Sequence, residues 1–117
     1  MNYKFIMPWP PSVNGYWRTF RNRQIISKRG RYYRDCAIEE MERLGLCGEG
    51  VSERLKVSLV LNPPTLRKYD IDNFCKALFD AISKSGFWLD DEQIDVLIIK
   101  KGEKIKDGNV EVSIEFR

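Results

Sequence analysis

Four short strand-like segments and two helical segments predict an α+β fold for this chain of 117 residues. Two of the strand-like segments, residues 55–61 and 110–116, have an apolar residue at every second position, and the helical ones have apolar residues three and four apart. Proline or glycine marks most boundaries. The expected order is β-α-β-α-β-β, with a mixed sheet and both helices on one face. This length supports one hydrophobic core, so residues 1–117 are expected to form a single domain.

The first half of the chain predicts a strand, a loop and a helix. Residues 3–7 read as a strand, which the proline-rich segment 8–11 ends because proline has no N–H for a sheet ladder. Residues 12–28 predict an irregular basic loop or a hairpin. A helix is then expected from an N-cap at Ser27 to about the residue before Gly45.

The second half begins with a strand at residues 55–61 that buries one face and ends at a proline pair. A second helix follows, capped by Asp72 or Asn73 and ending at Gly86. Residues 94–100 and 110–116 are then expected to form an antiparallel pair.

A loop containing the turn signal Asp107-Gly108-Asn109 is expected to join this pair. Four consecutive apolar residues at 96–99 indicate that both faces of their strand are covered. A subunit contact is one explanation.

The net charge of +3 hides a strong asymmetry. Residues 1–34 carry eight Lys or Arg and no acid, whereas the remainder carries 12 basic and 17 acidic residues. Such asymmetry indicates a polyanionic partner.

Several classes of protein are excluded by composition. The chain has no histidine, which excludes His-based nucleases, Ser-His-Asp hydrolases and His-ligated zinc sites. Its three cysteines form no C-x-x-C pair, which favours a reduced cytoplasmic location. The apolar N-terminal run is too short for a signal peptide or a membrane span, so no membrane association is expected.

Acidic residues gather between positions 70 and 91. Asp70 and Asp72, two positions apart in an extended segment, are expected to project to the same side. Asp91 follows a helix that carries the chain away by about 20 Å. If the chain folds back, the three carboxylates supply oxygen ligands for one or two Mg²⁺ ions. Lys76, one turn into the helix, is expected to stabilise charge on a phosphate.

Each acid also has a purely structural explanation. Asp72 can be a helix cap, Asp70 a loop residue and Asp90-Asp91 an acidic turn. We favour a metal site because clustered acids repel each other unless a cation neutralises them, and because the chain also carries a basic arm. Asp80 is expected to be solvated.

Three motifs follow one another along nearly the whole chain. They are Pro8-Trp9-Pro10-Pro11-Ser12-x-Asn14, Asp70-x-Asp72-Asn73-x-x-Lys76-x-x-x-Asp80 and Gly86-Phe87-Trp88-x-Asp90-Asp91. In this order they resemble the RusA family of Holliday junction resolvases. The resemblance implies a homodimeric, Mg²⁺-dependent endodeoxyribonuclease, with Mn²⁺ as a substitute ion, that nicks four-way DNA junctions symmetrically. A two-fold symmetric dimer presents two sites for the two cuts.

By motif match, Asp70, Asp72 and Asp91 take the role of essential metal-site carboxylates, and Lys76 that of the catalytic lysine. Asp90 matches a family acid without an assigned role. One departure is Tyr69, where relatives can carry a basic residue. The two residues before it, Arg67 and Lys68, supply that charge here.

The basic arm interleaves aromatic and cationic residues, a composition suited to phosphate contacts and to stacking on exposed bases. The expected DNA contacts are Arg18, Arg21, Arg23, Lys28, Arg29, Arg67, Lys68 and Lys76. Trp9 and Trp88 are assigned to packing, as large aromatic residues more often are.

Two other functions remain open from the sequence. In the first, the chain is a non-catalytic junction-binding or DNA-binding protein whose acids serve structure. In the second, it is a metal-dependent nuclease that acts on flaps or RNA.

Overall fold

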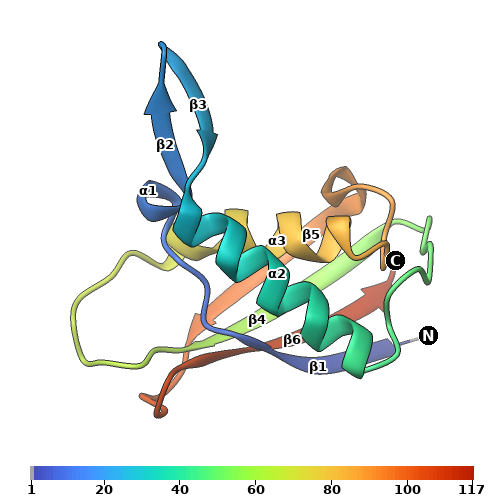
Figure 1. Ribbon diagram of the computed structural model, residues 1–117. Coiled ribbons are helices and arrows are strands. Elements are labelled where there is room, and N and C mark those ends of the chain that lie inside the picture. The colour runs from blue at the N-terminus through green and yellow to red at the C-terminus, as the bar shows by residue number, and fades with distance from the viewer. Residues whose placement is uncertain (1) are drawn as a thin grey trace.

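The computed structural model describes residues 2–117 and shows an α+β fold, as predicted. Its main sheet has four strands in the order β1-β6-β4-β5. Helices α2 and α3 pack against one face of this sheet, and a two-stranded hairpin projects from it (Figure 1). The helices and strands are β1 (Asn2–Pro8), α1 (Val13–Tyr16), β2 (Trp17–Phe20), β3 (Arg23–Ile26), α2 (Lys28–Arg43), β4 (Leu55–Asn62), α3 (Cys75–Lys84), β5 (Ile94–Lys101) and β6 (Asn109–Phe116). Two 3-10 turns are η1 (Ile71–Phe74) and η2 (Asp91–Gln93).

The core lies between the sheet and the two helices. Strands β4 and β6 bury alternate side chains, and α3 buries its apolar stripe against them. Trp88 is 1% exposed and its Nε1 donates to Ser83 Oγ at 2.6 Å, so the prediction of a packing role is confirmed. None of the helices within residues 2–117 is long and apolar enough to cross a membrane.

The basic segment after β1 forms a hairpin, one of the two predicted alternatives. Strands β2 and β3 pair antiparallel, and they are joined by Arg21 and Asn22, which have φ angles of 51° and 61°. Two successive positive φ angles are typical of the tight type I′ turn that matches the twist of a hairpin. The hairpin therefore places its charged turn away from the core (Figure 1).

The predicted limits of α2 are confirmed. Ser27 is the N-cap, and its hydroxyl accepts from the backbone N–H of Gly30 at 2.9 Å. The same hydroxyl donates to the carbonyl of Gly15 at 2.7 Å, which ties the helix to α1. Gly45 follows the helix with a φ of 74°, where a side chain would be strained.

The predicted cap of the second helix is wrong. Asp72 lies inside the 3-10 turn η1, and Asn73 follows it there. The N-cap position of α3 is Phe74, which makes no side-chain cap hydrogen bond. A 3-10 turn precedes α3, so its first N–H groups are not reached by either polar side chain. The helix ends before Gly86, whose φ is 80°, as predicted.

The predicted antiparallel pairing of the last two strands is also wrong. β5 pairs in parallel with β4, and β6 lies between β1 and β4, antiparallel to both. Because parallel neighbours cannot be joined by a tight turn, α3 forms the crossover between β4 and β5. β5 is an edge strand, with Leu97 41% exposed and Ile98 38% exposed.

Gly30 offers a test of how the hairpin is attached to the core. A Cβ atom at this position would lie 2.8 Å from the carbonyl oxygen of Tyr16 and 2.9 Å from Cγ1 of Ile26. Replacement of a helical glycine by alanine ordinarily raises the free energy of unfolding by up to about 1 kcal/mol. We expect Gly30→Ala instead to lower the free energy of unfolding by about 1–3 kcal/mol, because backbone and side chain must both shift. Urea unfolding of this variant beside Glu39→Ala, on the exposed face of α2, provides the measurement. A stabilised Gly30→Ala variant would contradict the packing described here.

Candidate active site

Asp91 is placed by the turn η2, immediately before β5. Asp90 caps this turn, and its carboxylate accepts from the N–H of Glu92 at 3.1 Å. Asp90 therefore has the structural role that the sequence left open for it. By capping the turn, Asp90 fixes the backbone position of the next residue, Asp91, which is half-buried.

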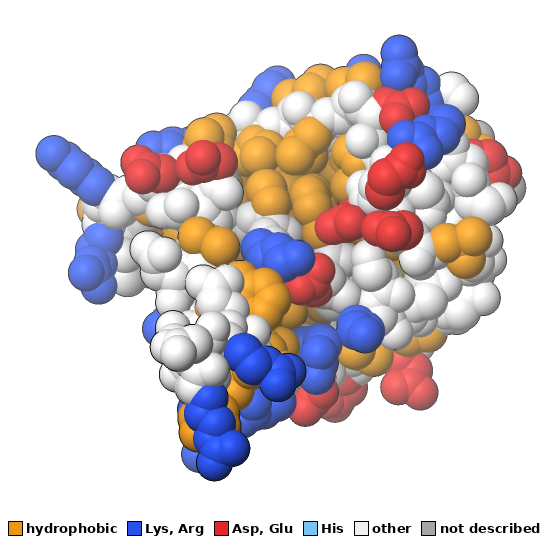
Figure 2. All heavy atoms as spheres, turned by 90° about the horizontal axis from the view of Figure 1, so that it is seen from above, with side chains coloured by type: hydrophobic (Ala, Val, Ile, Leu, Met, Phe, Trp, Pro, Cys, Tyr) orange, Lys and Arg blue, Asp and Glu red, His pale blue; other side chains and the backbone are white. Residues whose placement is uncertain are grey.

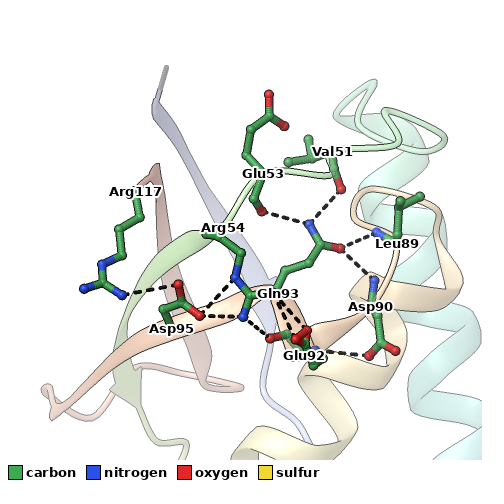
Figure 3. A network of polar contacts seen from close by, with 9 residues as sticks. All are labelled: Val51, Glu53, Arg54, Leu89, Asp90, Glu92, Gln93, Asp95 and Arg117. Carbon is green, nitrogen blue, oxygen red and sulfur yellow. Dashed lines mark hydrogen bonds and ion pairs between the residues drawn. The ribbon is translucent and has the colours of Figure 1, made fainter.

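Gln93 anchors this turn to the body of the protein. Its side chain is 6% exposed, and its Oε1 accepts from the backbone N–H groups of Leu89 and Asp90, both at 2.8 Å (Figure 3). Its Nε2 donates to the carbonyls of Val51 at 2.9 Å and Glu53 at 3.0 Å. One buried amide thus satisfies four backbone groups from two segments. This fixes the position of the chain on both sides of the acidic pair.

Arg54 holds the outer side of the same turn (Figure 3). Its guanidinium donates to the Glu92 carboxylate at 2.9 Å, to the Glu92 carbonyl at 2.8 Å and to Asp95. Arg117 reaches Asp95 as well, at 3.2 Å. Hydrogen bonding to Arg54 lowers the pKa of Asp95 below its usual value. These pairs are exposed to solvent, so they orient the turn more than they stabilise the fold.

Lys76 lies in a second polar cluster on α3. Its ammonium is 3.3 Å from Oδ1 of Asp80, and it lies 5.6 Å from the centre of the Trp17 ring. The hydroxyl of Tyr16 donates to Oδ2 of Asp80 at 2.9 Å. Burial first, and then the hydrogen bond to Asp80, raise the pKa of Tyr16. Asp80 therefore joins Lys76 to the start of the hairpin, and the prediction that it is merely solvated is wrong.

The electrostatics of Asp91 connect the two clusters. Burial raises the pKa of Asp91, and a hydrogen bond to Asp90 and the charges of Asp90 and Asp80 raise it further. The charge of Lys76 acts in the opposite direction. Asp90 has a lowered pKa, chiefly because it accepts from the N–H of Glu92. The surroundings therefore disfavour the ionised form of Asp91 and favour the ionised form of Asp90.

Asp70 and Asp72 precede α3 along the chain, at the turn η1. Both are exposed, one directly before η1 and one within it. Asp72 lies near the thiol of Cys75, whose pKa is raised to about 11 by burial first and by this charge second. Asp70 lines a groove of about 610 Å³ together with Arg67, Lys68 and Lys101.

The expected convergence of Asp70, Asp72 and Asp91 on one ion is not found in the single chain. Within residues 2–117 there is no group of three or more His, Cys, Asp or Glu side chains that could hold a metal ion. On the face shown in Figure 2, carboxylates lie in separate groups with hydrophobic and cationic side chains between them. Asp91 instead lies within electrostatic range of Lys76 and Asp80, which form an ion pair with each other.

The donor chemistry nevertheless suits a hard divalent cation. All the candidate ligands are carboxylate oxygens, which Mg²⁺ prefers. Asp91 is also held among like charges, so a nearby cation would relieve repulsion that the fold imposes. The carboxylate chemistry of Asp70, Asp72 and Asp91 fits such an ion. Their arrangement in one chain does not bring all three to a single ion.

The predicted DNA contacts fall on three exposed segments, apart from Lys76, which lies in α3. Arg18, Arg21 and Arg23 lie on the hairpin, where Lys and Arg side chains gather at its end (Figure 2). Two of them, Arg18 and Arg21, lie 5.6 Å and 5.2 Å from the centre of the Phe20 ring. The remaining ones are Lys28 and Arg29 at the start of α2, and Arg67 and Lys68 in the loop before η1.

Sequence reasoning missed Gln93 and the role of Asp80. Asp90-x-x-Gln93 has the spacing of a capping box, in which a side chain at the third position returns to the cap, and this signal was available. Asp80 lies four residues after Lys76, a spacing that brings side chains together on a helix. Its bond to Tyr16 has no local signal, because the two residues are 64 positions apart.

Removal of the Gln93 amide tests whether it fixes this turn. We expect Gln93→Leu to lower the free energy of unfolding by more than about 2 kcal/mol, because buried backbone groups lose their partners. Glu92→Gln, which weakens an exposed ion pair in the same turn, is the matched control and should change it by less than about 1 kcal/mol. Chemical unfolding of both variants measures the difference. Equal effects would show that the buried amide has no special role.

The charge interaction between Asp80 and Asp91 has a separate test. Since the charge of Asp80 raises the pKa of Asp91, we expect Asp80→Asn to lower that pKa. Carboxyl carbon shifts of Asp91 followed by NMR across a pH titration report it directly. Glu103→Gln, in an exposed loop, should leave the titration of Asp91 unchanged. An unaltered midpoint in Asp80→Asn would mean that the two carboxylates do not interact.

Comparison with known proteins agrees with the motifs. The family model for Endodeoxyribonuclease RusA matches residues 8–115. A protein of Shigella sonnei (strain Ss046) named crossover junction endodeoxyribonuclease RusA is 38% identical over 112 residues, which cover 96% of this chain and 92% of the relative. Proteins of the same name from Escherichia coli (strain K12) and Enterobacteria phage 82 are 37% and 38% identical over the same shares. The chain therefore belongs to the RusA endodeoxyribonuclease family.

Proposed function

We propose that this protein is a Mg²⁺-dependent endodeoxyribonuclease that selects four-way DNA junctions and resolves them by paired symmetric nicks. The observation that carries the proposal is the similarity to crossover junction endodeoxyribonucleases along 96% of the chain, motifs included. In this proposal residues 1–117 act as one RusA-like nuclease domain in the cytoplasm, and two copies form a homodimer. Two-fold symmetry then matches the two strands to be cut.

Asp70, Asp72 and Asp91 are the proposed metal-site carboxylates. When bound, the divalent cation supplies positive charge at the phosphate and acidifies water; Mn²⁺ is the proposed substitute. Asp91 keeps a raised pKa among like charges, so it exchanges its proton for a cation more readily as pH rises. The residues around it hold this carboxylate in place without any ion.

Lys76 is the proposed electrostatic stabiliser of the phosphate. Asp80 holds its ammonium at 3.3 Å, and Tyr16 holds Asp80. The lysine side chain is long and 43% exposed, so it can leave Asp80 for a phosphate oxygen without a change of the backbone. A positive charge close to the reacting phosphate stabilises the negative charge that grows there.

The hairpin supports recognition of DNA. Its exposed arginines project away from the sheet, and α2 presents two more cations beside it. Phosphate contacts of this kind position DNA without reading its sequence. We propose that these side chains hold the arms of a junction while the carboxylates act on the backbone.

Asp70→Asn separates catalysis from binding. We expect this variant to bind a synthetic four-way junction with unchanged affinity and to lose Mg²⁺-dependent nicking by more than about 100-fold, since an oxygen ligand is weakened. Asp35→Asn, an exposed acid outside the motifs, is the matched control and should nick normally. Full cleavage by Asp70→Asn would overturn the proposed site. A wild-type protein that bound junctions without ever nicking them would favour the non-catalytic alternative.

A further inference from the structure

A cavity of about 630 Å³ lies beside the candidate active site. Three segments form it: the proline-rich residues 8–12, the N-terminal part of α2, and residues 63–74, which comprise the loop that leads into η1 and η1 itself. The segments are far apart in the sequence and meet only in the folded chain. The volume is sufficient for one nucleotide.

One wall of this cavity is aromatic. Trp9 packs against Phe74 with ring centres 4.8 Å apart and against Tyr69 at 5.9 Å, and Tyr69 contacts Phe74 at 5.6 Å. All three residues are only half-buried, so they keep surface open to the cavity. Tyr32, from α2, also lines the cavity and is 71% exposed. Exposed aromatic faces of this kind stack on unpaired bases.

The charge of the cavity suits a phosphate-bearing ligand. Among the described residues that line it, Arg29, Arg67 and Lys68 are cationic and none is acidic. Within residues 2–117 none of these three cations takes part in an ion pair. An aromatic wall with unneutralised cations around it matches the two parts of a nucleotide, the base and the phosphate.

The cavity is continuous with the groove that contains Asp70. The two share four lining residues, which are Arg67, Lys68, Tyr69 and Asn73. Tyr69 directly precedes Asp70. A nucleotide whose base lay against the aromatic wall would therefore have its sugar-phosphate backbone near the groove that contains Asp70. The cavity therefore opens toward Asp70, one of the proposed metal-site residues.

We propose that this cavity receives one unstacked nucleotide of the DNA substrate, with its base against Trp9, Tyr69 and Phe74 and its phosphate beside Arg67 and Lys68. The proposal rests on the proposed function, because a four-way junction supplies strained nucleotides at its crossover. It adds a base-binding site to the phosphate contacts of the hairpin. The pocket would fix which phosphate of the strand lies over Asp70.

A double-substitution cycle between protein and DNA tests this site. Binding to four-way junctions is measured in EDTA, so that no strand is cut, with an abasic site placed at each nucleotide around the crossover in turn. In the wild-type protein, we expect loss of the base to weaken binding about tenfold at one symmetry-related pair of positions. In Trp9→Leu and in Tyr32→Ala this penalty should fall below about twofold, because the stacking partner is already missing. Ile6→Ala, an exposed residue on the other face of the sheet, should keep the full penalty.

The outcomes separate the pocket from the proposed activity. Tyr32 is exposed, so its variant keeps the fold, and a thermal melt checks the Trp9 variant. Penalties that are the same in wild type and both variants, or absent at every position of the wild type, would overturn the pocket. If the penalty is present in wild type and lost in both variants, but the wild-type protein never nicks with Mg²⁺, the pocket is supported and the proposed function fails.

Discussion

The parallel pairing of β4 with β5 is the constraint on which the candidate site depends. Two parallel neighbours cannot be joined by a turn, so the chain must cross the sheet, and α3 makes that crossing. The turn η2, directly before β5, thereby comes to lie against α3. Asp91 comes within electrostatic range of Lys76 and Asp80, although the end of α3 and a loop separate it from them along the chain.

The surroundings of Asp91 show how a small protein holds a charged group among like charges. The buried amide of Gln93 completes the hydrogen bonds of two backbone segments, and the exposed pairs of Arg54 orient the turn from outside. The free energy of this arrangement comes from the buried bonds, because exposed ion pairs contribute little. The carboxylate at its centre is left partly buried with a raised pKa, a state that a cation would relieve. Perturbed acids in such positions are typical of functional sites.

Local signals in the sequence were sufficient for some elements and not for others. Ser27 and Gly45 were predicted correctly as the limits of α2, because caps depend on residues three or four positions away. The strands beside β6 were not predicted correctly. Alternation of Val110, Val112 and Ile114 shows which face of β6 is buried, but it does not show which strands pair with β6. Asp80 was assigned to solvent from the pattern of its own helix. Its partner Tyr16 comes from a distant segment that no periodicity connects to α3.

The cutting pattern of the wild-type protein on an end-labelled four-way junction, with and without Mg²⁺, tests the proposed activity. We expect two nicks at symmetry-related positions on opposing strands, only when Mg²⁺ is present, and little cutting of linear duplex, flap or RNA. Equal cutting of all these substrates, or identical products in EDTA, would contradict it.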